Sequence, residues 1–342
     1  MDELSKAWLI GGGLVIGGIF GLLAQRSGFC AVSAISNSKL MGDYRHLDGY
    51  IAAILVALSG TLILELIGLV DIGTSLYRRP TFNWAGALFG GLIFGIGAML
   101  SGGCASRTLV RSAEGNIGAI VTLLAFALSG MATLIGILDP ARAWVASSAI
   151  DLEPGDASLS KLIGQPHYLL PVMVVVSGII YLYRHLREQN NWSYIFYGSG
   201  IGLCVVISWW ITGVLGQDDF FELPPTSIAV AGPLSRGAVY ISTGEVTGNH
   251  FAFYLLPGMI IGAFVSALIS GRFHWVPPAG SMVGSYLLGG ILMGVGAVFA
   301  GGCNIGQGLS GLSTFSITSL IAVGAILSGM SLTLTWINKR TK

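Results

Sequence analysis

Two cysteines in this chain end the same glycine-rich apolar segment. The first copy reads GGLIFGIGAMLSGGC and ends at Cys104, and the second reads GGILMGVGAVFAGGC and ends at Cys303. The copies lie 199 positions apart without a gap, and eight of their fifteen positions are identical. A third cysteine, Cys30, follows Ser-Gly-Phe. A thiol is a soft, polarisable group and a weak hydrogen-bond donor, so these positions are candidates for binding a soft anion.

The Gly-Gly pair before each repeated cysteine predicts a break in the helix. Each glycine weakens a helix by about 1 kcal/mol relative to alanine, so two in succession favour a helix end. A new helix beginning near Cys104 or Cys303 presents unpaired N–H groups and a partial positive charge, which together make an anion site. The candidate backbone positions are Gly102, Gly103, Gly301 and Gly302.

Polar side chains beside the cysteines add hydrogen-bond donors. Arg107 follows the first copy, and Asn304 and Gln307 follow the second. Arg107 has two interpretations: it extends to the membrane interface, as arginines at helix ends commonly do, or it binds or steers an anion. Gly306 stands at the equivalent position of the second copy, so any role of Arg107 breaks the symmetry.

Several other kinds of chemistry are not indicated. No CxxC pair occurs, and no histidine or carboxylate lies inside the cysteine motifs, so neither a metal site nor a cofactor is predicted. Cys204 lies in mid-helix among apolar neighbours and is interpreted as an inert packed thiol. The net charge of +1 gives no sign of nucleic-acid binding. No GxxxxGK[ST] motif is present for ATP.

The elements that carry these residues are membrane helices in contact with lipid. Hydrophobic residues make up 53% of the chain and charged residues 10%, and an apolar helix of about 20 residues crosses a ~30 Å hydrocarbon core. The sequence predicts an all-α integral membrane protein with about nine long transmembrane helices and additional short re-entrant helices. The apolar runs are 7–24, 48–70, 84–101, 117–138, 168–183, 195–215, 252–270, 283–300 and 316–337.

The repeat extends beyond the cysteine segments and predicts two pseudo-symmetric halves. The repeated block covers roughly 84–134 and 283–333. We expect one transmembrane domain over 1–342, with internal repeat halves of approximately 1–140 and 166–338. Duplicated halves are a common transporter plan, with substrate bound where the repeats meet. A weaker echo, in which 18–29 is laid on 262–273, matches at three positions and would pair Cys30 with His274. Glycines that we expect to serve helix packing are Gly90, Gly91, Gly95 and Gly97.

The three cysteine motifs resemble those of the YeeE/YedE family of bacterial membrane proteins. The matching segments are SGFC at 27–30, SGGCASR at 101–107 and GGCNIGQGLSG at 301–311. The resemblance implies a multi-pass protein of the bacterial inner membrane that imports thiosulfate or a related sulfur compound. It also implies a compact helical fold with inverted pseudo-twofold repeats, short helices entering from both faces, and a relay of thiosulfate by the S–H groups of Cys30, Cys104 and Cys303. Some family members work with a cytosolic sulfur carrier of the TusA type, and some are tied to selenium.

We therefore expect a sulfur-anion transporter and not an enzyme. Two roles for the thiols are open: protonated thiols that donate hydrogen bonds, which we favour, or a thiolate that attacks thiosulfate and carries a persulfide. The alternatives are a membrane thiol oxidoreductase, a carrier of selenium or another sulfur species, and a passive anion channel. Basic residues flank the apolar runs at many ends, so the positive-inside rule gives no orientation from the sequence alone.

Overall fold

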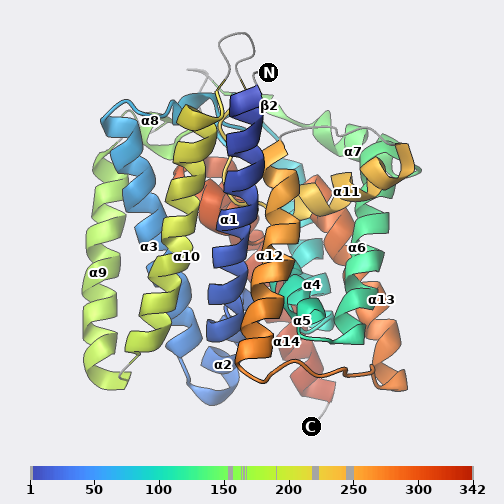
Figure 1. The fold of residues 1–342 in the computed structure, drawn as a ribbon. Coiled ribbons are helices and arrows are strands. Elements are labelled where there is room, and N and C mark those ends of the chain that lie inside the picture. The colour runs from blue at the N-terminus through green and yellow to red at the C-terminus, as the bar shows by residue number, and fades with distance from the viewer. Residues whose placement is uncertain are drawn as a thin grey trace.

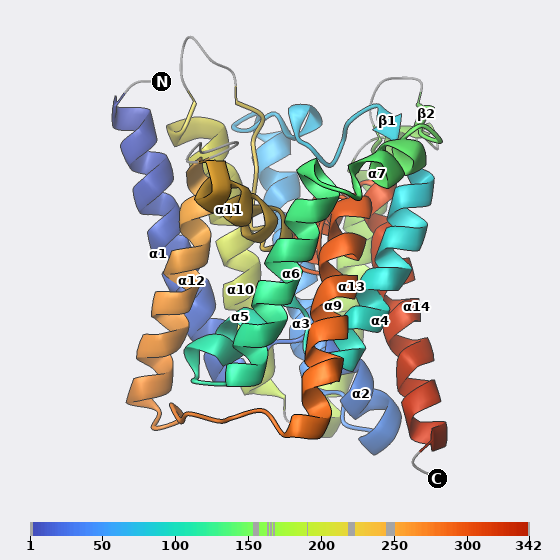
Figure 2. The same cartoon turned by 90° about the vertical axis from the view of Figure 1, so that its right-hand side faces the viewer.

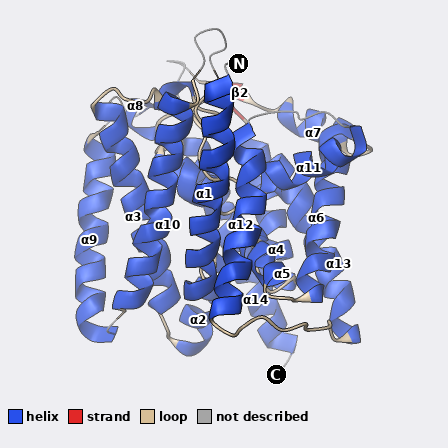
Figure 3. Cartoon of the chain, viewed as in Figure 1, coloured by secondary structure: helices blue, strands red, loops and turns tan. Residues whose placement is uncertain are grey.

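A computed structural model of the chain gives a bundle of long helices with short helices inserted between them (Figures 1 and 3). It describes residues 3–152, 157–162, 164, 166, 168–189, 191–217, 223–243 and 250–340. Within these residues the only sheet is a single pairing of β1 (Thr81–Phe82) with β2 (Ile150–Asp151), which are antiparallel. The predicted all-helical membrane fold is confirmed.

Nine helices in the described part of the chain are long and apolar enough to cross a membrane, as the nine apolar runs predict. These helical stretches are α1 (Glu3–Ser27) with the segment that continues to Met41, α3 (Arg45–Leu66), η2 (a π-helical turn, Gly86–Gly90) and α4 (Gly91–Leu100) with the segment that continues to Ala113, α6 (Ile117–Ile135), α9 (Leu169–Gln189), α10 (Trp192–Trp210) with the π-helical turn η3 (Ile211–Leu215), α12 (His250–Ile269), α13 (Val283–Phe299) and α14 (Ile317–Arg340).

The short elements lie between the long helices or at their ends. The N-terminal and C-terminal ends of the chain lie at opposite faces of the bundle (Figures 1 and 2), which we call the N-side and the C-side. The short helices α2 (Ala31–Met41) and α5 (Ala105–Ala113) lie toward the C-side, whereas α11 (Ala231–Thr243) lies toward the N-side (Figure 2). The remaining pieces are α7 (Asp139–Ala146), α8 (Leu159–Leu162), the 3₁₀ turns η1 (Ile72–Thr74) and η4 (Gly280–Met282), and the π-helical turn η5 (Gly306–Gly311).

The centre of the bundle is an antiparallel pair, α4 and α13, packed backbone to backbone. A Cβ atom added to Gly97 would lie 2.7 Å from the carbonyl oxygen of Gly289, and one added to Gly289 would lie 2.8 Å from that of Gly97. Gly90 and Gly296 oppose each other in the same way, at 2.8 and 2.7 Å. The offset of 199 converts one contact into the other with the copies exchanged. The two repeated segments are therefore related by an inverted pseudo-twofold axis.

Each central helix also packs on the last helix of the other copy. A Cβ atom on Gly95 would lie 2.2 Å from the carbonyl oxygen of Ile326 in α14, and one on Gly294 would lie 2.4 Å from that of Phe126 in α6. Only a residue without a Cβ allows backbones to approach so closely. The expected packing role of these glycines is confirmed, and it brings the ends of α4 and α13 close to the middle of the protein.

The remaining long helices surround this centre in two parallel pairs. Helix α1 packs along α12, and α3 packs along α10. Gly17 and Gly21 of α1 lie against the backbone of α12 at Leu255 and Met259, so residue numbers rise together along the pair. Helix α9 lies at the edge (Figure 1) and contacts mainly α3. Most of its apolar side chains are exposed, as expected for a helix that faces lipid.

Candidate thiol pathway

Cys30, Cys104 and Cys303 each follow a helix that ends in the same way. A glycine two positions before each cysteine adopts a left-handed backbone, which strains any residue carrying a Cβ. These glycines are Gly28, Gly102 and Gly301, with φ of 64°, 70° and 68°. In each case the N–H of the next residue donates to the carbonyl five positions earlier, at 3.2, 3.0 and 2.8 Å. This pattern is the Schellman end of a helix, and it confirms the predicted break at both Gly-Gly pairs.

Each cysteine then begins a new helical segment. The carbonyl oxygen of the cysteine accepts the first bond from the N–H four positions later, at 3.0, 2.8 and 2.8 Å for Cys30, Cys104 and Cys303. Cys30 and Cys104 are the residues immediately before α2 and α5. Because η2 and α4 contain 5 and 10 residues, they cover about 22 Å, less than a ~30 Å core. Helix α5 therefore starts within the depth of the membrane, where its free N–H groups can meet an anion.

Two of the three thiols lie together. The sulfur atoms of Cys30 and Cys104 are 3.9 Å apart, and Ser106 Oγ lies 3.3 Å from the Cys104 sulfur. Both cysteines are almost completely buried and neither is in a disulfide. The pair offers two S–H groups and one hydroxyl within a few ångströms, which suits a ligand that accepts several weak hydrogen bonds.

Tyr50 of α3 lies between this pair and Cys303. Its ring stacks on Phe29, the residue directly before Cys30, with ring centroids 5.2 Å apart. Its hydroxyl donates to the carbonyl oxygen of Asn304 at 3.2 Å. The Asn304 carboxamide is 1% exposed, and neither its nitrogen nor its oxygen has a hydrogen-bond partner. A buried amide without partners costs about 1–3 kcal/mol, so this side chain is well placed to bind a polar ligand beside Cys303.

Gln307, the other predicted donor of the second motif, is hydrogen-bonded within the protein. Its Nε2 donates to the carbonyl oxygen of Ala300 at 2.9 Å, and its Oε1 accepts from the Ser319 hydroxyl at 2.6 Å. Gln307 thus connects the end of α13 to the start of α14 around the Gly301–Gly302 turn. Of the predicted donors, Gln307 is the one whose side chain holds the backbone in place. The second hydrogen of its Nε2 remains to donate into the cavity that Gln307 lines.

A cavity of about 860 Å³ on the N-side reaches Cys303. Gly301, Gly302 and Gln307 belong to its lining, and so do three arginines, Arg79, Arg142 and Arg236. Arginines in a cleft with apolar walls raise the local concentration of anions. Tyr77 also lines this cavity, and burial next to the Cys303 thiol raises the pKa of the Tyr77 hydroxyl above its ordinary value, so the hydroxyl stays a neutral donor.

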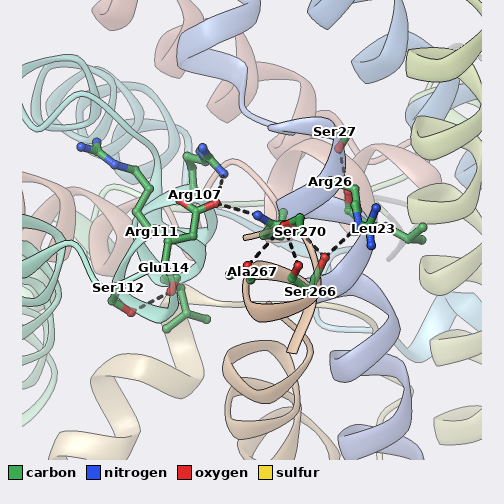
Figure 4. Close-up of polar contacts among 12 residues, drawn as sticks. Leu23, Arg26, Ser27, Arg107, Arg111, Ser112, Glu114, Ser266, Ala267 and Ser270 are labelled. Atoms are coloured by element: carbon green, nitrogen blue, oxygen red, sulfur yellow. Dashed lines mark hydrogen bonds and ion pairs between the residues drawn. The ribbon is translucent and has the colours of Figure 1, made fainter. Parts of the chain in front are cut away.

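On the C-side, Arg107 is part of a polar network that joins α5 to α1 and α12 (Figure 4). Its Nη1 lies 3.6 Å from Glu114 Oε1, which also accepts from Gln25 Nε2 at 3.3 Å. Gln25 Oε1 in turn accepts from Ser266, whose Oγ accepts from Arg26. Arg107, three positions after Cys104, is therefore held in an ion pair with Glu114. Its role in binding or steering an anion stays a prediction.

Gly102 and Gly103, the predicted backbone positions of the first copy, accept hydrogen bonds that hold the turn before α5. The carbonyl of Gly102 accepts from Arg111 Nη1 at 3.3 Å, and that of Gly103 accepts from the Ser101 hydroxyl at 3.1 Å. Cys204 is buried in the middle of α10, away from these contacts. Within the described ranges, no three histidine, cysteine, aspartate or glutamate side chains come together as a metal site would require.

Comparison with known proteins identifies the family of the chain. The sequence model for sulphur transport proteins matches residues 26–332. The chain belongs to this sulphur transport family. It is therefore a transporter and not an enzyme, a multi-pass protein of the bacterial inner membrane, and the resemblance to YeeE/YedE proteins is confirmed.

Three relatives illustrate the range of similarity within the family. The chain is 25% identical over 317 residues to thiosulfate transporter TsuA of Escherichia coli (strain K12), covering 87% of this chain and 86% of the relative. It is 27% identical over 343 residues to thiosulfate transporter TsuA of Spirochaeta thermophila, covering 95% and 98%. It is 32% identical over 117 residues to probable transporter YedE of Escherichia coli, covering 34% and 25%.

In the second half of this sulphur transport protein, valine occupies the position that corresponds to Cys30 in the first half. Helix α2 connects α1 to α3, and α11 connects α10 to α12 from the opposite side (Figure 2). Val230 immediately precedes α11, and its carbonyl accepts from the Leu234 N–H at 3.0 Å, just as the Cys30 carbonyl begins α2. His274, which the weak sequence echo would pair with Cys30, lies in the loop after α12 and donates its N–H to the Glu114 carbonyl. Val230 thus shares the first helical hydrogen bond with the three cysteines, but not the left-handed glycine that precedes each of them.

Proposed function

We propose that this protein carries thiosulfate, or a sulfur anion of the same class, into the cell along Cys303, Cys104 and Cys30. The observation that carries the proposal is that three buried thiols stand at three helix starts that have the same backbone. The two relatives that align over most of this chain are named thiosulfate transporters. The coarser conclusion, sulfur-anion transport, follows from the family; the thiol relay and its residues are our proposal.

The anion enters from the N-side cavity, where the arginines concentrate it near Cys303. It then moves past Asn304 and Tyr50 to the Cys104–Cys30 pair and leaves beside Arg107. At each point it exchanges one set of neutral donors for the next: S–H groups, a carboxamide, hydroxyls and helix N–H groups. Because each donor binds weakly, the anion is never held tightly enough to stop its passage.

The thiols act in their protonated form. All three thiols are buried, and a thiol that keeps its proton can donate a hydrogen bond to an anion. A thiolate would also repel a dianion, whereas a protonated thiol attracts it. In the competing mechanism a cysteine thiolate attacks the outer sulfur of thiosulfate, the S–S bond of thiosulfate breaks, and sulfite leaves while the cysteine keeps a persulfide; this requires a nucleophilic thiolate.

The distribution of basic residues supports an orientation with the C-side in the cytosol. Helix ends that lie toward the C-side carry basic residues: Arg26 in the last turn of α1, Lys39 in the last turn of α2, Arg45 at the start of α3 and Arg111 in the last turn of α5. Positive residues are retained on the cytoplasmic side of a membrane. The thiol pair would then deliver the anion inward, where a TusA-type carrier receives its sulfur.

Uptake of ³⁵S-labelled thiosulfate into proteoliposomes tests the relay. Cys104→Ala and Cys303→Ala each remove one donor and should slow uptake about tenfold, since one hydrogen bond contributes roughly 1–1.5 kcal/mol. Cys204→Ala is the matched control and should match wild type. Wild-type rates in both relay variants would overturn the relay.

Serine variants separate the two thiol mechanisms. A serine hydroxyl still donates a hydrogen bond but cannot form a persulfide, so Cys104→Ser should keep part of the uptake that Cys104→Ala loses. Equal loss in both variants would favour the persulfide mechanism. In wild type, uptake that saturates with thiosulfate concentration opposes a passive channel, and competition by unlabelled selenium and sulfur oxyanions identifies the preferred species.

A further inference from the structure

We propose that Tyr50 is the gate of the thiol pathway, closing the route between Cys303 and the Cys104–Cys30 pair and donating its hydroxyl to the anion as it passes. This inference rests on the proposed function and adds a specificity-determining residue to it. Tyr50 lies outside all three cysteine motifs, on a different helix. Its contact with Asn304 joins residues 254 positions apart in the chain.

The position of the Tyr50 ring accounts for the gate. The ring is 6% exposed and stacks on Phe29, the residue directly before Cys30, with ring centroids 5.2 Å apart. Its hydroxyl reaches the backbone of the second motif at Asn304, the residue directly after Cys303. One side chain therefore spans the distance from the first thiol segment to the third. An anion moving between them meets this ring.

Gly308 shows how closely the hydroxyl is held. A Cβ atom added to Gly308 would lie 2.5 Å from Tyr50 Oη and 3.3 Å from Asn304 Oδ1. The Tyr50 hydroxyl can therefore pack against η5 because Gly308 has no Cβ. The same space borders the Asn304 carboxamide, whose two polar atoms lack partners.

The hydroxyl has a partner that it can exchange. In this structure it donates to a neutral backbone carbonyl. A charged sulfur–oxygen anion is a stronger acceptor than a carbonyl, because hydrogen bonds to ions are roughly twice as strong as those between neutral groups. When an anion arrives at Cys303, the Tyr50 hydroxyl turns to it and the ring leaves the route. Asn304 Nδ2, already without an acceptor, donates from the other side.

Two substitutions at Tyr50 separate the hydroxyl from the ring. Tyr50→Phe keeps the ring and should slow thiosulfate uptake about five- to tenfold, the effect of one hydrogen bond. Tyr50→Ala removes the ring and should take up labelled sulfate faster than wild type does, so that thiosulfate-to-sulfate discrimination falls. Tyr183→Phe removes a hydroxyl from the exposed helix α9 and should change neither quantity.

A double-mutant cycle tests whether Gly308 acts through Tyr50. Gly308→Ala should slow uptake strongly in the wild-type background, because the new methyl displaces the hydroxyl. In the Tyr50→Phe background, which has no hydroxyl to displace, the same change should cost at least threefold less. A purely structural effect at either residue would give independent, multiplicative losses.

The outcomes separate this proposal from the function on which it rests. If wild type does not transport thiosulfate, or if Cys104→Ala and Cys303→Ala match wild type, the proposed relay fails first. If wild type transports and the cysteine variants do not, a Tyr50→Phe rate equal to wild type overturns the gate alone. A Tyr50→Ala protein that elutes as a folded monodisperse species yet takes up sulfate no faster than wild type also overturns it; if that variant does not fold, the Phe variant and the cycle decide.

Discussion

The sulfur atoms of Cys30 and Cys104 lie 3.9 Å apart, although 74 positions separate the two residues. Each cysteine starts a different helix, and the backbones meet there because both preceding helices end at a left-handed glycine. Two free thiols at this distance can each donate to one bound anion. They are also near enough to be oxidised to a disulfide, whose sulfur atoms are about 2 Å apart.

Oxidation is therefore expected to stop transport reversibly. The sequence contains four cysteines. A mild thiol oxidant should remove one pair of them from the thiols that can be titrated in the denatured protein, and should block thiosulfate uptake. Dithiothreitol should restore both. Cys30→Ala should be insensitive to the oxidant, whereas Cys204→Ala should respond like wild type. Undiminished uptake after complete oxidation of the pair would contradict a route through these thiols.

Arg107 is expected to assist the anion at the C-side end of the route. Arg107→Met keeps much of the side-chain volume but removes the charge near Cys30, and should slow uptake about tenfold at low salt, where a charged donor contributes roughly 1.5 kcal/mol or more. The loss should shrink as ionic strength rises, since salt screens partly exposed charges. Arg184→Met, on α9, is the matched control. A loss that does not change with salt would argue for a packing role.

Glu114 should oppose Arg107 in the same assay. The ion pair between them leaves less positive charge for the anion, so Glu114→Gln should lower the thiosulfate concentration that gives half-maximal uptake. Half-maximal concentrations for wild type and Glu114→Gln, measured side by side at low salt, check this. An increase in that concentration would contradict the competition between Glu114 and the anion for Arg107.

The central glycine contacts predict opposite effects for two similar substitutions. Gly97→Ala would place a methyl 2.7 Å from both the Gly289 carbonyl oxygen and the Met293 nitrogen, and should destabilise the protein by about 1–3 kcal/mol. Gly324→Ala adds a methyl in α14 with nothing within 4 Å and should be neutral or stabilise the helix by up to about 1 kcal/mol. Thermal unfolding in detergent measures both. Equal unfolding midpoints for the two variants would mean that α4 and α13 can move apart at Gly97 without a loss of stability.

A buried ion pair near the N-side should matter for stability. The Arg78 guanidinium, 4% exposed, pairs with both carboxylate oxygens of Glu65, and its Nε donates to the Thr314 carbonyl at 2.9 Å. Arg78→Met leaves the carboxylate without its partner and should cost about 3–5 kcal/mol. The neighbouring exposed Arg79→Met should cost much less than that. Unfolding in denaturant measures the free energy of unfolding of both variants. Equal losses of stability would contradict a stabilising role for the ion pair of Arg78.

Hydropathy and glycine placement were sufficient to predict much of the fold. The nine apolar runs became nine helices because a lipid environment leaves few other ways to satisfy the backbone. The breaks before Cys104 and Cys303 agree with the low helix propensity of paired glycines. Gly289 and Gly290 lie inside α13, however, so a glycine pair does not by itself end a helix. The halves 1–140 and 166–338 stay a prediction, although the contacts between α4 and α13 fit an inverted repeat.

The site depended on contacts that a local pattern does not contain. Tyr50 could not be found from the cysteine motifs, since only the packing of α3 against η5 brings it to Asn304. Gln307 matched the pattern of an anion donor, but the fold uses its carboxamide to hold Ala300 and Ser319. The correspondence of Cys30 with Val230 also escaped the sequence, because it lies in backbone geometry and not in residue identity.

The N-side cavity has a further consequence for energetics. Because it extends inward as far as Cys303, water filling this cavity would concentrate the membrane voltage over the buried stretch beyond that residue. Moving one elementary charge through 100 mV involves about 2.3 kcal/mol, and thiosulfate carries two negative charges. A negative cell interior thus opposes entry by about 4.6 kcal/mol, or more than a thousandfold in concentration. The proposed uptake of thiosulfate would therefore need cations that enter with the anion, or reactions that keep its cytosolic concentration very low.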